Sequence, residues 1–211
     1  DAAQHLVTLD PVAVELVDDT MIELARSIPI FQPTVEEAVR GNPAALLLVE
    51  FAEEDMAENE RRLRQLHEMM GDLGFGWDKG AAWRGGVVDA IDPGMQGRIS
   101  EWRKSGLNIM MSEKSEAKPV SFLEDCAVEL KDLAEYTDKL TAIFDRNGVK
   151  GTWYAHASVG CLHVRPVLNM KQACGAETMR AIAEEAFELV RFFGGSHSGE
   201  HGDGIVRSEF N

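Results

Sequence analysis

The amino-acid sequence predicts an α+β fold, in which an antiparallel or mixed sheet is covered by helices. Short segments rich in apolar and β-branched residues alternate with longer segments whose apolar residues recur every three or four positions. One β-rich segment, residues 152–168, is interrupted at Ser158-Val159-Gly160, which indicates the two strands of a hairpin. Strands that alternate with helices and include a hairpin are typical of this fold class.

The first half of the chain is predicted to hold two helices and one strand. Apolar residues fit helical spacing approximately over residues 12–26, and two prolines in residues 28–34 predict a loop. Residues 44–51 form an apolar run after a Gly-Asn-Pro turn, which indicates a buried strand. A long charged helix is expected over residues 55–72.

The second half is predicted to repeat the order of strand and helix. Residues 120–128 resemble a strand, and residues 130–146 place apolar side chains at helical spacing before an Asn-Gly pair. After the hairpin, residues 179–193 carry the strongest helical signal, because their apolar residues recur at steps of three and four. Gly194-Gly195 is expected to end that helix.

The composition indicates which partners the protein can bind and in which cellular compartment it is found. The 211 residues include 36 acidic and 21 basic side chains, for a net charge of -15, so we expect no binding to nucleic acid. No apolar run is long enough to span a bilayer, and the first residues lack the features of a secretory signal. The three cysteines form no Cys-x-x-Cys pair and are expected to be reduced thiols of a cytoplasmic protein.

Two histidines and a glycine-rich loop form the first candidate site. His156 and His163 are seven residues apart and would lie on opposite faces of one straight strand. If the chain turns between them, the two imidazoles come from opposing arms of a hairpin and can converge on a metal ion. The loop adds Glu200 and His201, and two histidines with one glutamate match a catalytic divalent-metal site. The alternative is that these histidines are hydrogen-bonded core residues and the loop is an ordinary polar turn.

A cationic stretch in this acidic chain is the second candidate. Arg103 and Lys118 lie in it, and guanidinium and ammonium groups are typical partners of a carboxylate. The alternative is solvated surface charge that balances neighbouring glutamates.

Four motifs together resemble one known family. They are HASVGCLHVRP at residues 156–166, SGEHGDG at residues 198–204, WRKSGL at residues 102–107 and SFLEDCAV at residues 121–128. The combination resembles the C-terminal substrate, or cap, domain of FAD-linked 2-hydroxyacid oxidoreductases. That family includes D-lactate dehydrogenases, the glycolate oxidase flavin subunit and D-2-hydroxyglutarate dehydrogenases. The resemblance runs from about residue 44 to the end and implies a ferredoxin-like FAD-linked oxidase C-terminal domain.

The resemblance implies a metal site and a base. In members that bind metal, two histidines and one glutamate hold zinc or a similar divalent ion, and these correspond to His156, His163 and Glu200. The histidine that follows the glutamate, here His201, is the expected general base. The cofactors implied are therefore FAD and a divalent metal, Zn or Mn.

Three cationic residues are implied to bind the substrate. Arg103 and Lys118 correspond to the residues that hold the substrate carboxylate. The family's usual Gly-Asp-Gly-Asn-x-His becomes Ser-Val-Gly-Cys-Leu-His at residues 158–163, and Arg165 stands where an Asn can contact substrate. Arg165 is therefore a further substrate-binding candidate.

The resemblance also implies that residues 1–211 form one domain of a longer chain. The family's FAD-binding domain normally precedes this region, and its glycine-rich flavin loops are not found in this sequence. FAD is expected to be held mainly by that domain of the full-length chain. The variant first motif looks most like the large bacterial members that also carry an iron-sulfur region.

The leading hypothesis is a flavin-dependent enzyme that oxidises a D-2-hydroxy acid to the 2-oxo acid, with the isolated chain inactive. Its expected partners are a small 2-hydroxy acid and the FAD-binding domain, and a homo-oligomer is left open. The expected location is the cytoplasm, including the periphery of the inner membrane through an electron acceptor. Two alternatives are kept: a metal-dependent hydrolase, and a non-catalytic oligomerisation or interaction module.

Overall fold

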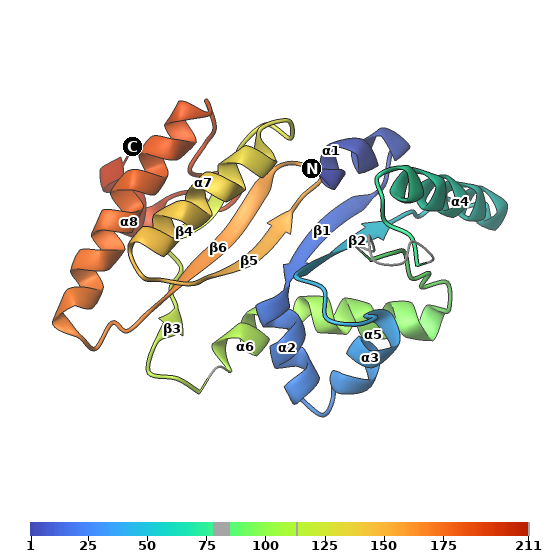
Figure 1. Cartoon of the computed structure of the whole chain (residues 1–211), viewed down its shortest axis with the longest axis horizontal. Coiled ribbons are helices and arrows are strands. Elements are labelled where there is room, and N and C mark those ends of the chain that lie inside the picture. Colours follow the sequence, from blue (N-terminus) through green and yellow to red (C-terminus); the bar gives the residue numbers. More distant parts are fainter. Residues whose placement is uncertain (78–84, 113, 211) are drawn as a thin grey trace. The chain divides into compact units, whose positions relative to one another are not determined.

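The computed structural model describes residues 1–77, 85–112 and 114–210 (Figure 1). The chain divides into two compact units, Ala2–Met110 and Met111–Asn211, and Asp1 belongs with the second. We call them the N-terminal and C-terminal units. Each unit contains antiparallel strands together with helices, which confirms the predicted α+β class.

The N-terminal unit is built on one antiparallel strand pair. Strand β1 pairs with β2 from Ala13 opposite Glu50 to Asp18 opposite Ala45. The elements of this unit are α1 (Ala2–Leu6), η1 (Val7–Leu9), β1 (Ala13–Asp18), α2 (Asp19–Ser27), α3 (Gln32–Ala38), β2 (Ala45–Glu50), α4 (Met56–Asp72), α5 (Pro93–Lys104) and α6 (Gly106–Met111).

The helix predicted over residues 12–26 is wrong in its first half. Strand β1 occupies that half and helix α2 the second, and Asp18 marks the junction, where its carboxylate accepts the N–H of Met21 at 2.9 Å. A short apolar segment fits a period of 2 or of 3.6 almost equally well. The ladder with β2 selects the strand, because it provides hydrogen-bond partners for the backbone of both segments.

The loop predicted over residues 28–34 ends earlier than expected. Helix α3 begins at Gln32, and Pro33 lies in its first turn, where a helix requires no backbone N–H. The strand predicted over residues 44–51 is confirmed by β2, but its expected burial is wrong, because the residues of β2 are half-buried or exposed. The helix predicted over residues 55–72 is confirmed by α4.

The C-terminal unit is built around β6. Strand β5 pairs with one edge of β6, and β4 and β3 pair with the other edge, all in antiparallel orientation. The elements of this unit are β3 (Lys118–Pro119), β4 (Leu123–Ala127), α7 (Leu133–Arg146), β5 (Gly151–His156), β6 (Cys161–Leu168), α8 (Ala173–Phe192), α9 (Gly204–Arg207) and η3 (Ser208–Phe210). The hairpin and the two helices predicted for this half are confirmed.

Helices α7 and α8 cover one face of this sheet (Figure 1). Trp153 lies opposite Val164 in the β5–β6 ladder, and its ring is 5.8 Å from the ring of Phe144 on α7. Side chains alternate along a strand, so His163 and Arg165 belong to the other face. The histidines therefore lie on the face opposite to α7 and α8.

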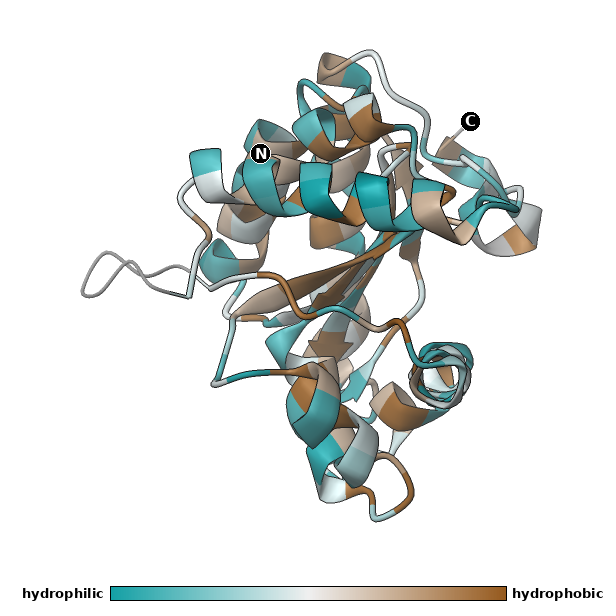
Figure 2. Cartoon of the chain, turned by 90° about the vertical axis from the view of Figure 1, so that its right-hand side faces the viewer, coloured by the Kyte–Doolittle hydropathy of each residue, from teal (hydrophilic) through white to brown (hydrophobic). Residues whose placement is uncertain are grey.

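The core of the C-terminal unit follows from amphipathic helices. Figure 2 shows this pattern for the chain as a whole: the helices carry both hydrophilic and hydrophobic residues, while the strands are mainly hydrophobic. Fully buried side chains come from α7, α8 and the sheet, among them Tyr136, Leu140, Phe144, Ile182, Leu123 and Val164. Within the described ranges, no helix has the length and apolarity needed to cross a membrane.

Candidate active site

The β5–β6 hairpin brings the two histidines together, which is the case that was expected if the chain turned between them. His156 lies opposite Cys161 in the ladder, and His163 lies opposite Tyr154, so both imidazoles project from one face. Their ring centroids are 5.0 Å apart. The turn depends on Gly160, whose φ of +70° is left-handed. A Cβ on that glycine would lie 2.1 Å from the carbonyl oxygen of Val128, so the turn fits closely against the chain after β4.

The loop that follows α8 supplies a carboxylate between these histidines. The Oε2 atom of Glu200 is 3.6 Å from Nε2 of His156 and 3.6 Å from Nε2 of His163. The Nε2 atom of His201 is 3.7 Å from the same oxygen, and the His201 ring stacks on that of His163 at 5.3 Å. Three imidazoles therefore surround one carboxylate oxygen.

The separations suit a divalent metal ion. Two donors bonded to one Zn²⁺ at about 2.0–2.1 Å in tetrahedral geometry lie about 3.3–3.5 Å apart. The Glu200 oxygen has nearly this spacing from each of the two histidine nitrogens, and the three ligand atoms all lie within 4.8 Å of one another. Burial and the nearby His156 lower the pKa of His163, which favours the neutral imidazole that a metal requires. The donor set thus fits the ion that the sequence predicted.

The three imidazoles differ in how much of each is exposed to solvent. The His163 side chain is 9% exposed and that of His156 is 26% exposed, whereas the His201 side chain is 55% exposed. A small molecule can reach the His201 imidazole more easily than the two hairpin histidines.

Asp125 binds the backbone of the loop that carries Glu200 and His201, although it was not among the predicted site residues. It is fully buried on β4, and its carboxylate accepts the N–H groups of Glu200 and His201 at 2.6 and 2.7 Å. Burial alone would raise the pKa of Asp125, but the N–H groups of His201 and Glu200 outweigh this effect and hold the pKa below its usual value. One signal was available: the motif SFLEDCAV places two adjacent acids in a segment predicted to be a strand, and a buried acid there requires partners.

Two further buried groups lie beside Asp125. The thiol of Cys161 lies 3.5 Å from an Asp125 oxygen, and burial together with Glu200 and Asp125 raises the pKa of Cys161 to about 12. Arg207 of α9 is buried and donates to the carbonyl oxygens of Glu124, His197 and Gly202. The sequence analysis gave no indication of this role for Arg207.

The three cationic candidates occupy different elements. Arg165 is buried on the face of β6 that carries His163, and its guanidinium is ion-paired with Glu124. Lys118 is half-buried in β3, opposite Leu168. Arg103 belongs to α5 of the N-terminal unit, where its Nη2 lies 2.6 Å from an oxygen of the buried Glu15. The role of Arg103 in substrate binding stays a prediction.

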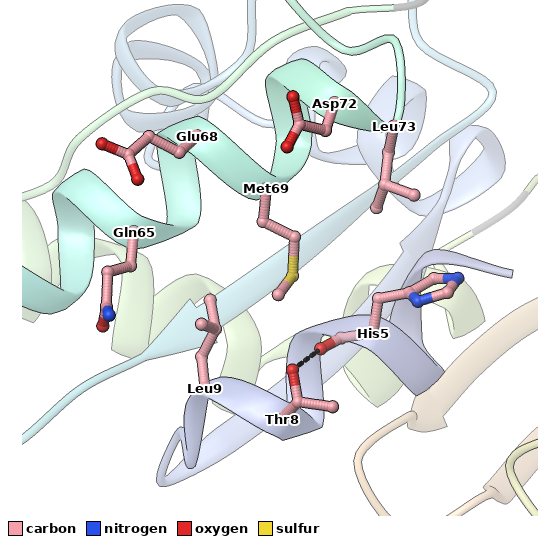
Figure 3. A pocket seen from close by; sticks show the side chains of 8 residues that line it. All are labelled: His5, Thr8, Leu9, Gln65, Glu68, Met69, Asp72 and Leu73. Carbon is pink, nitrogen blue, oxygen red and sulfur yellow. Dashed lines mark hydrogen bonds between the residues drawn. The ribbon is translucent and has the colours of Figure 1, made fainter.

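A separate depression lies in the N-terminal unit between α4 and the segment of α1 and η1 (Figure 3). It has a volume of about 360 Å³, and Leu9 and Met69 project into it from the two sides. Its lining is His5, Thr8, Leu9, Gln65, Glu68, Met69, Asp72 and Leu73. None of the predicted site residues belongs to this lining.

Comparison with known proteins identifies the family. Residues 1–211 match the family described as FAD linked oxidases, C-terminal domain, and the chain belongs to this family. The chain is 32% identical to the D-2-hydroxyglutarate dehydrogenase of Pantoea ananatis over 96% of its own length, and 30% identical to that of Escherichia coli over 99%. It is 25% identical over 53% of its length to the glycolate oxidase subunit GlcD of Bacillus subtilis. The chain spans about 20% of the length of the two dehydrogenases and 23% of GlcD. The resemblance seen in the motifs is thereby confirmed.

Proposed function

We propose that this chain is the substrate domain of a flavin-dependent oxidoreductase that oxidises a D-2-hydroxy acid to the 2-oxo acid. The family, and relatives named as D-2-hydroxyglutarate dehydrogenases, support this reaction class. The observation that carries the proposal is the convergence of His156 and His163 on one oxygen of Glu200, with His201 beside it.

In this proposal, His156, His163 and Glu200 hold a divalent metal, Zn or Mn. The 3.6 Å separations and the lowered pKa of His163 support that ligand set. When bound, such an ion polarises the substrate hydroxyl and lowers its pKa.

His201 then accepts the hydroxyl proton. Its side chain is the most exposed of the three imidazoles, and its Nε2 lies within 3.7 Å of the proposed ligand Glu200, so it can reach a hydroxyl group placed there. FAD, held by the FAD-binding domain of a full-length chain, would supply the acceptor for the hydride on the substrate Cα. One proton and one hydride account for the two hydrogens that the substrate loses.

The cationic residues hold the substrate carboxylates. We assign Lys118, Arg103 and Arg165 to this task because each carries a charge suited to a carboxylate. Arg103 and Arg165 are ion-paired with Glu15 and Glu124, so a substrate carboxylate would have to share or replace those partners. A substrate like 2-hydroxyglutarate has two carboxylates, and more than one cation is needed to hold both.

The three cysteines are free thiols, which supports the cytoplasmic location that we include in the proposal.

The metal is tested on the 211-residue chain. We expect about one Zn²⁺ or Mn²⁺ per chain after dialysis, measured by elemental analysis, and none in a folded His156→Ala/His163→Ala variant. His67→Ala is the matched control, because His67 belongs to the N-terminal unit and pairs with Asp89 at 2.8 Å. Failure of the folded parent chain to bind either ion would refute the metal site.

The reaction is tested on the full-length flavoprotein with D-2-hydroxyglutarate, D-lactate and glycolate. We expect His201→Ala to lower turnover by about 10²-fold or more while the metal content is retained, because a general base contributes that much. Turnover close to that of the parent would exclude His201 as the base. A metal-loaded flavoprotein that oxidises none of these acids would refute the proposed reaction.

A further inference from the structure

Asp125 has a backbone conformation that its residue type disfavours. Its φ is +75°, in the left-handed region that glycine adopts freely, and the β4–β6 register shifts between Glu124 and Cys126. The residue is 0% exposed, so this bulge turns a carboxylate into the interior. A strained, buried and charged residue persists only where the surrounding contacts compensate for it.

The compensating contacts come from the loop that carries Glu200 and His201. Oδ1 of Asp125 accepts the N–H of Glu200 at 2.6 Å, and Oδ2 accepts the N–H of His201 at 2.7 Å. The backbone carbonyl of Asp125 accepts the N–H of Gly199 at 2.7 Å. Three consecutive backbone N–H groups therefore donate hydrogen bonds to Asp125.

Further contacts complete the surroundings of this carboxylate. The hydroxyl of Ser198 lies 3.4 Å from Oδ2, the thiol of Cys161 lies 3.5 Å from Oδ1, and the Nη2 atom of Arg207 lies 3.9 Å from Oδ2. Both oxygens of Asp125 are thus engaged by the loop and the groups beside it. Although Asp125 lies near Glu200 and His201, its oxygens are directed at their backbone.

We propose that Asp125 is the positioning residue of the active site: by binding two successive backbone N–H groups, it orients the metal ligand Glu200 and the base His201 together. This inference rests on the proposed function. The carboxylate of Asp125 also lies within 4.8 Å of ligand atoms of Glu200 and His201, but both of its oxygens accept backbone N–H groups. In this inference Asp125 therefore acts through the backbone of Glu200 and His201 and not as a metal ligand. Fixing both residues from one carboxylate keeps the distance between ligand and base constant, which a proton transfer near a bound ion requires.

Two substitutions separate the carboxylate from the backbone conformation. Asp125→Gly permits the left-handed φ without strain but removes both acceptors. Asp125→Asn retains one side-chain oxygen and places an NH₂ group against the second N–H. We expect the parent to hold the amide protons of Glu200 and His201 against hydrogen exchange, and their exchange to become at least tenfold faster in Asp125→Gly, with Asp125→Asn between the two.

Metal affinity provides a second readout. By titration calorimetry with Zn²⁺ or Mn²⁺ on the 211-residue chain, the dissociation constant should rise about 10–100-fold in Asp125→Gly, the range seen when residues that orient ligands are removed. In the full-length enzyme, kcat should fall more than KM rises, because the carboxylate-binding cations are unchanged. The matched control is Asp18→Asn, because Asp18 is also a buried aspartate that accepts a backbone N–H but belongs to the N-terminal unit. Asp18→Asn should leave metal affinity unchanged.

The outcomes separate the inference from the function on which it rests. A folded Asp125→Gly variant with parental amide exchange and parental metal affinity would overturn the positioning role. If that variant does not fold, Asp125→Asn decides by the same two measurements. A parent chain that binds neither ion would refute the metal site, and amide exchange together with the kcat of the full-length enzyme would then decide the role of Asp125. Metal binding without oxidation of any D-2-hydroxy acid would refute the proposed reaction and leave the orientation of Glu200 measurable by affinity.

Discussion

Glu124 on β4 and Arg165 on β6 form an ion pair that is almost completely withdrawn from solvent. Their side chains are 17% and 10% exposed, and Glu124 lies directly opposite His163 in the ladder. The pair therefore occupies the same face of the sheet as the candidate metal ligands. Charges that are buried in this way depend on one another, because neither can be solvated alone.

Removing one partner of this pair should destabilise the C-terminal unit strongly. We expect Glu124→Gln or Arg165→Met to lower the free energy of unfolding by about 3 kcal/mol each, since each leaves one uncompensated buried charge. The double variant should lose clearly less than the sum of the two. Urea titration followed by circular dichroism measures all four proteins. Strictly additive losses would show that the two side chains are not coupled.

The hairpin turn should tolerate no side chain at Gly160. Gly160 and Gly148 have nearly the same φ, +70° and +65°, but a Cβ on Gly148 would meet nothing within 4 Å. Gly148→Ala should therefore cost only the left-handed strain, about 1 kcal/mol of unfolding free energy. Gly160→Ala adds a collision with the carbonyl of Val128. We therefore expect this variant either to lose about 3 kcal/mol of unfolding free energy or to have a displaced turn that binds metal more weakly. Equal losses in the two variants, measured by thermal unfolding, would contradict this interpretation of the turn.

Arg207 should stabilise the loop that carries the site. It is buried and donates to three backbone carbonyls, so Arg207→Met leaves several acceptors without a partner. We expect a loss of about 3 kcal/mol in the free energy of unfolding. Arg180→Met is the control, because Arg180 is exposed and bridges Glu184 and Glu209 on the surface, where ion pairs contribute little. Similar stability of the two variants in urea would show that Arg207 is not required.

The three thiols should differ sharply in reactivity. Cys174 is exposed, whereas Cys126 and Cys161 are 1% and 2% exposed. Burial raises the pKa of Cys126 to about 12 and is also the main reason that the pKa of Cys161 rises to about 12. Raising the pH increases the thiolate fraction, but at pH 9 a thiol with such a pKa is only about one part in a thousand thiolate.

A disulfide reagent tests this order directly. At pH 8 we expect one thiol per native chain to react quickly, and all three to react in urea. Cys174→Ser should abolish the fast phase of the native protein. Persistence of a fast phase in that variant would mean that one of the two buried thiols is accessible.

Several helices were predictable because the pattern that indicates them lies within one continuous segment of the sequence. Helices α4, α7 and α8 repeat apolar residues over several turns, and such long periodic segments admit one interpretation. The shorter β1 was mistaken for helix because its few apolar residues fit two periods, and pairing with β2 decided between them. Helix α5 was not predicted, since its two glycines and weak amphipathic pattern leave little signal beyond the Asp92 cap and Pro93.

Part of the candidate site could also be predicted from the sequence. From the odd spacing of His156 and His163, the imidazoles were expected to be able to converge if the chain turned between them, and the register of the hairpin places both on one face. Glu200 and His201 were selected for their residue types in a glycine-rich loop, and the family motif then implied their roles. The metal, and the roles assigned to these residues, stay predictions for the experiments above.

The sequence by itself determined the α+β class, the hairpin and the family, because alternation, helical periodicity and motifs are properties of neighbouring residues. Only the tertiary structure decided which buried groups support the site. Asp125 binds a loop 75 residues later in the chain, and Arg165 pairs with Glu124 across a ladder. Such partners are chosen by the need to satisfy every buried charge and backbone N–H in three dimensions, and no periodicity along the chain records that choice.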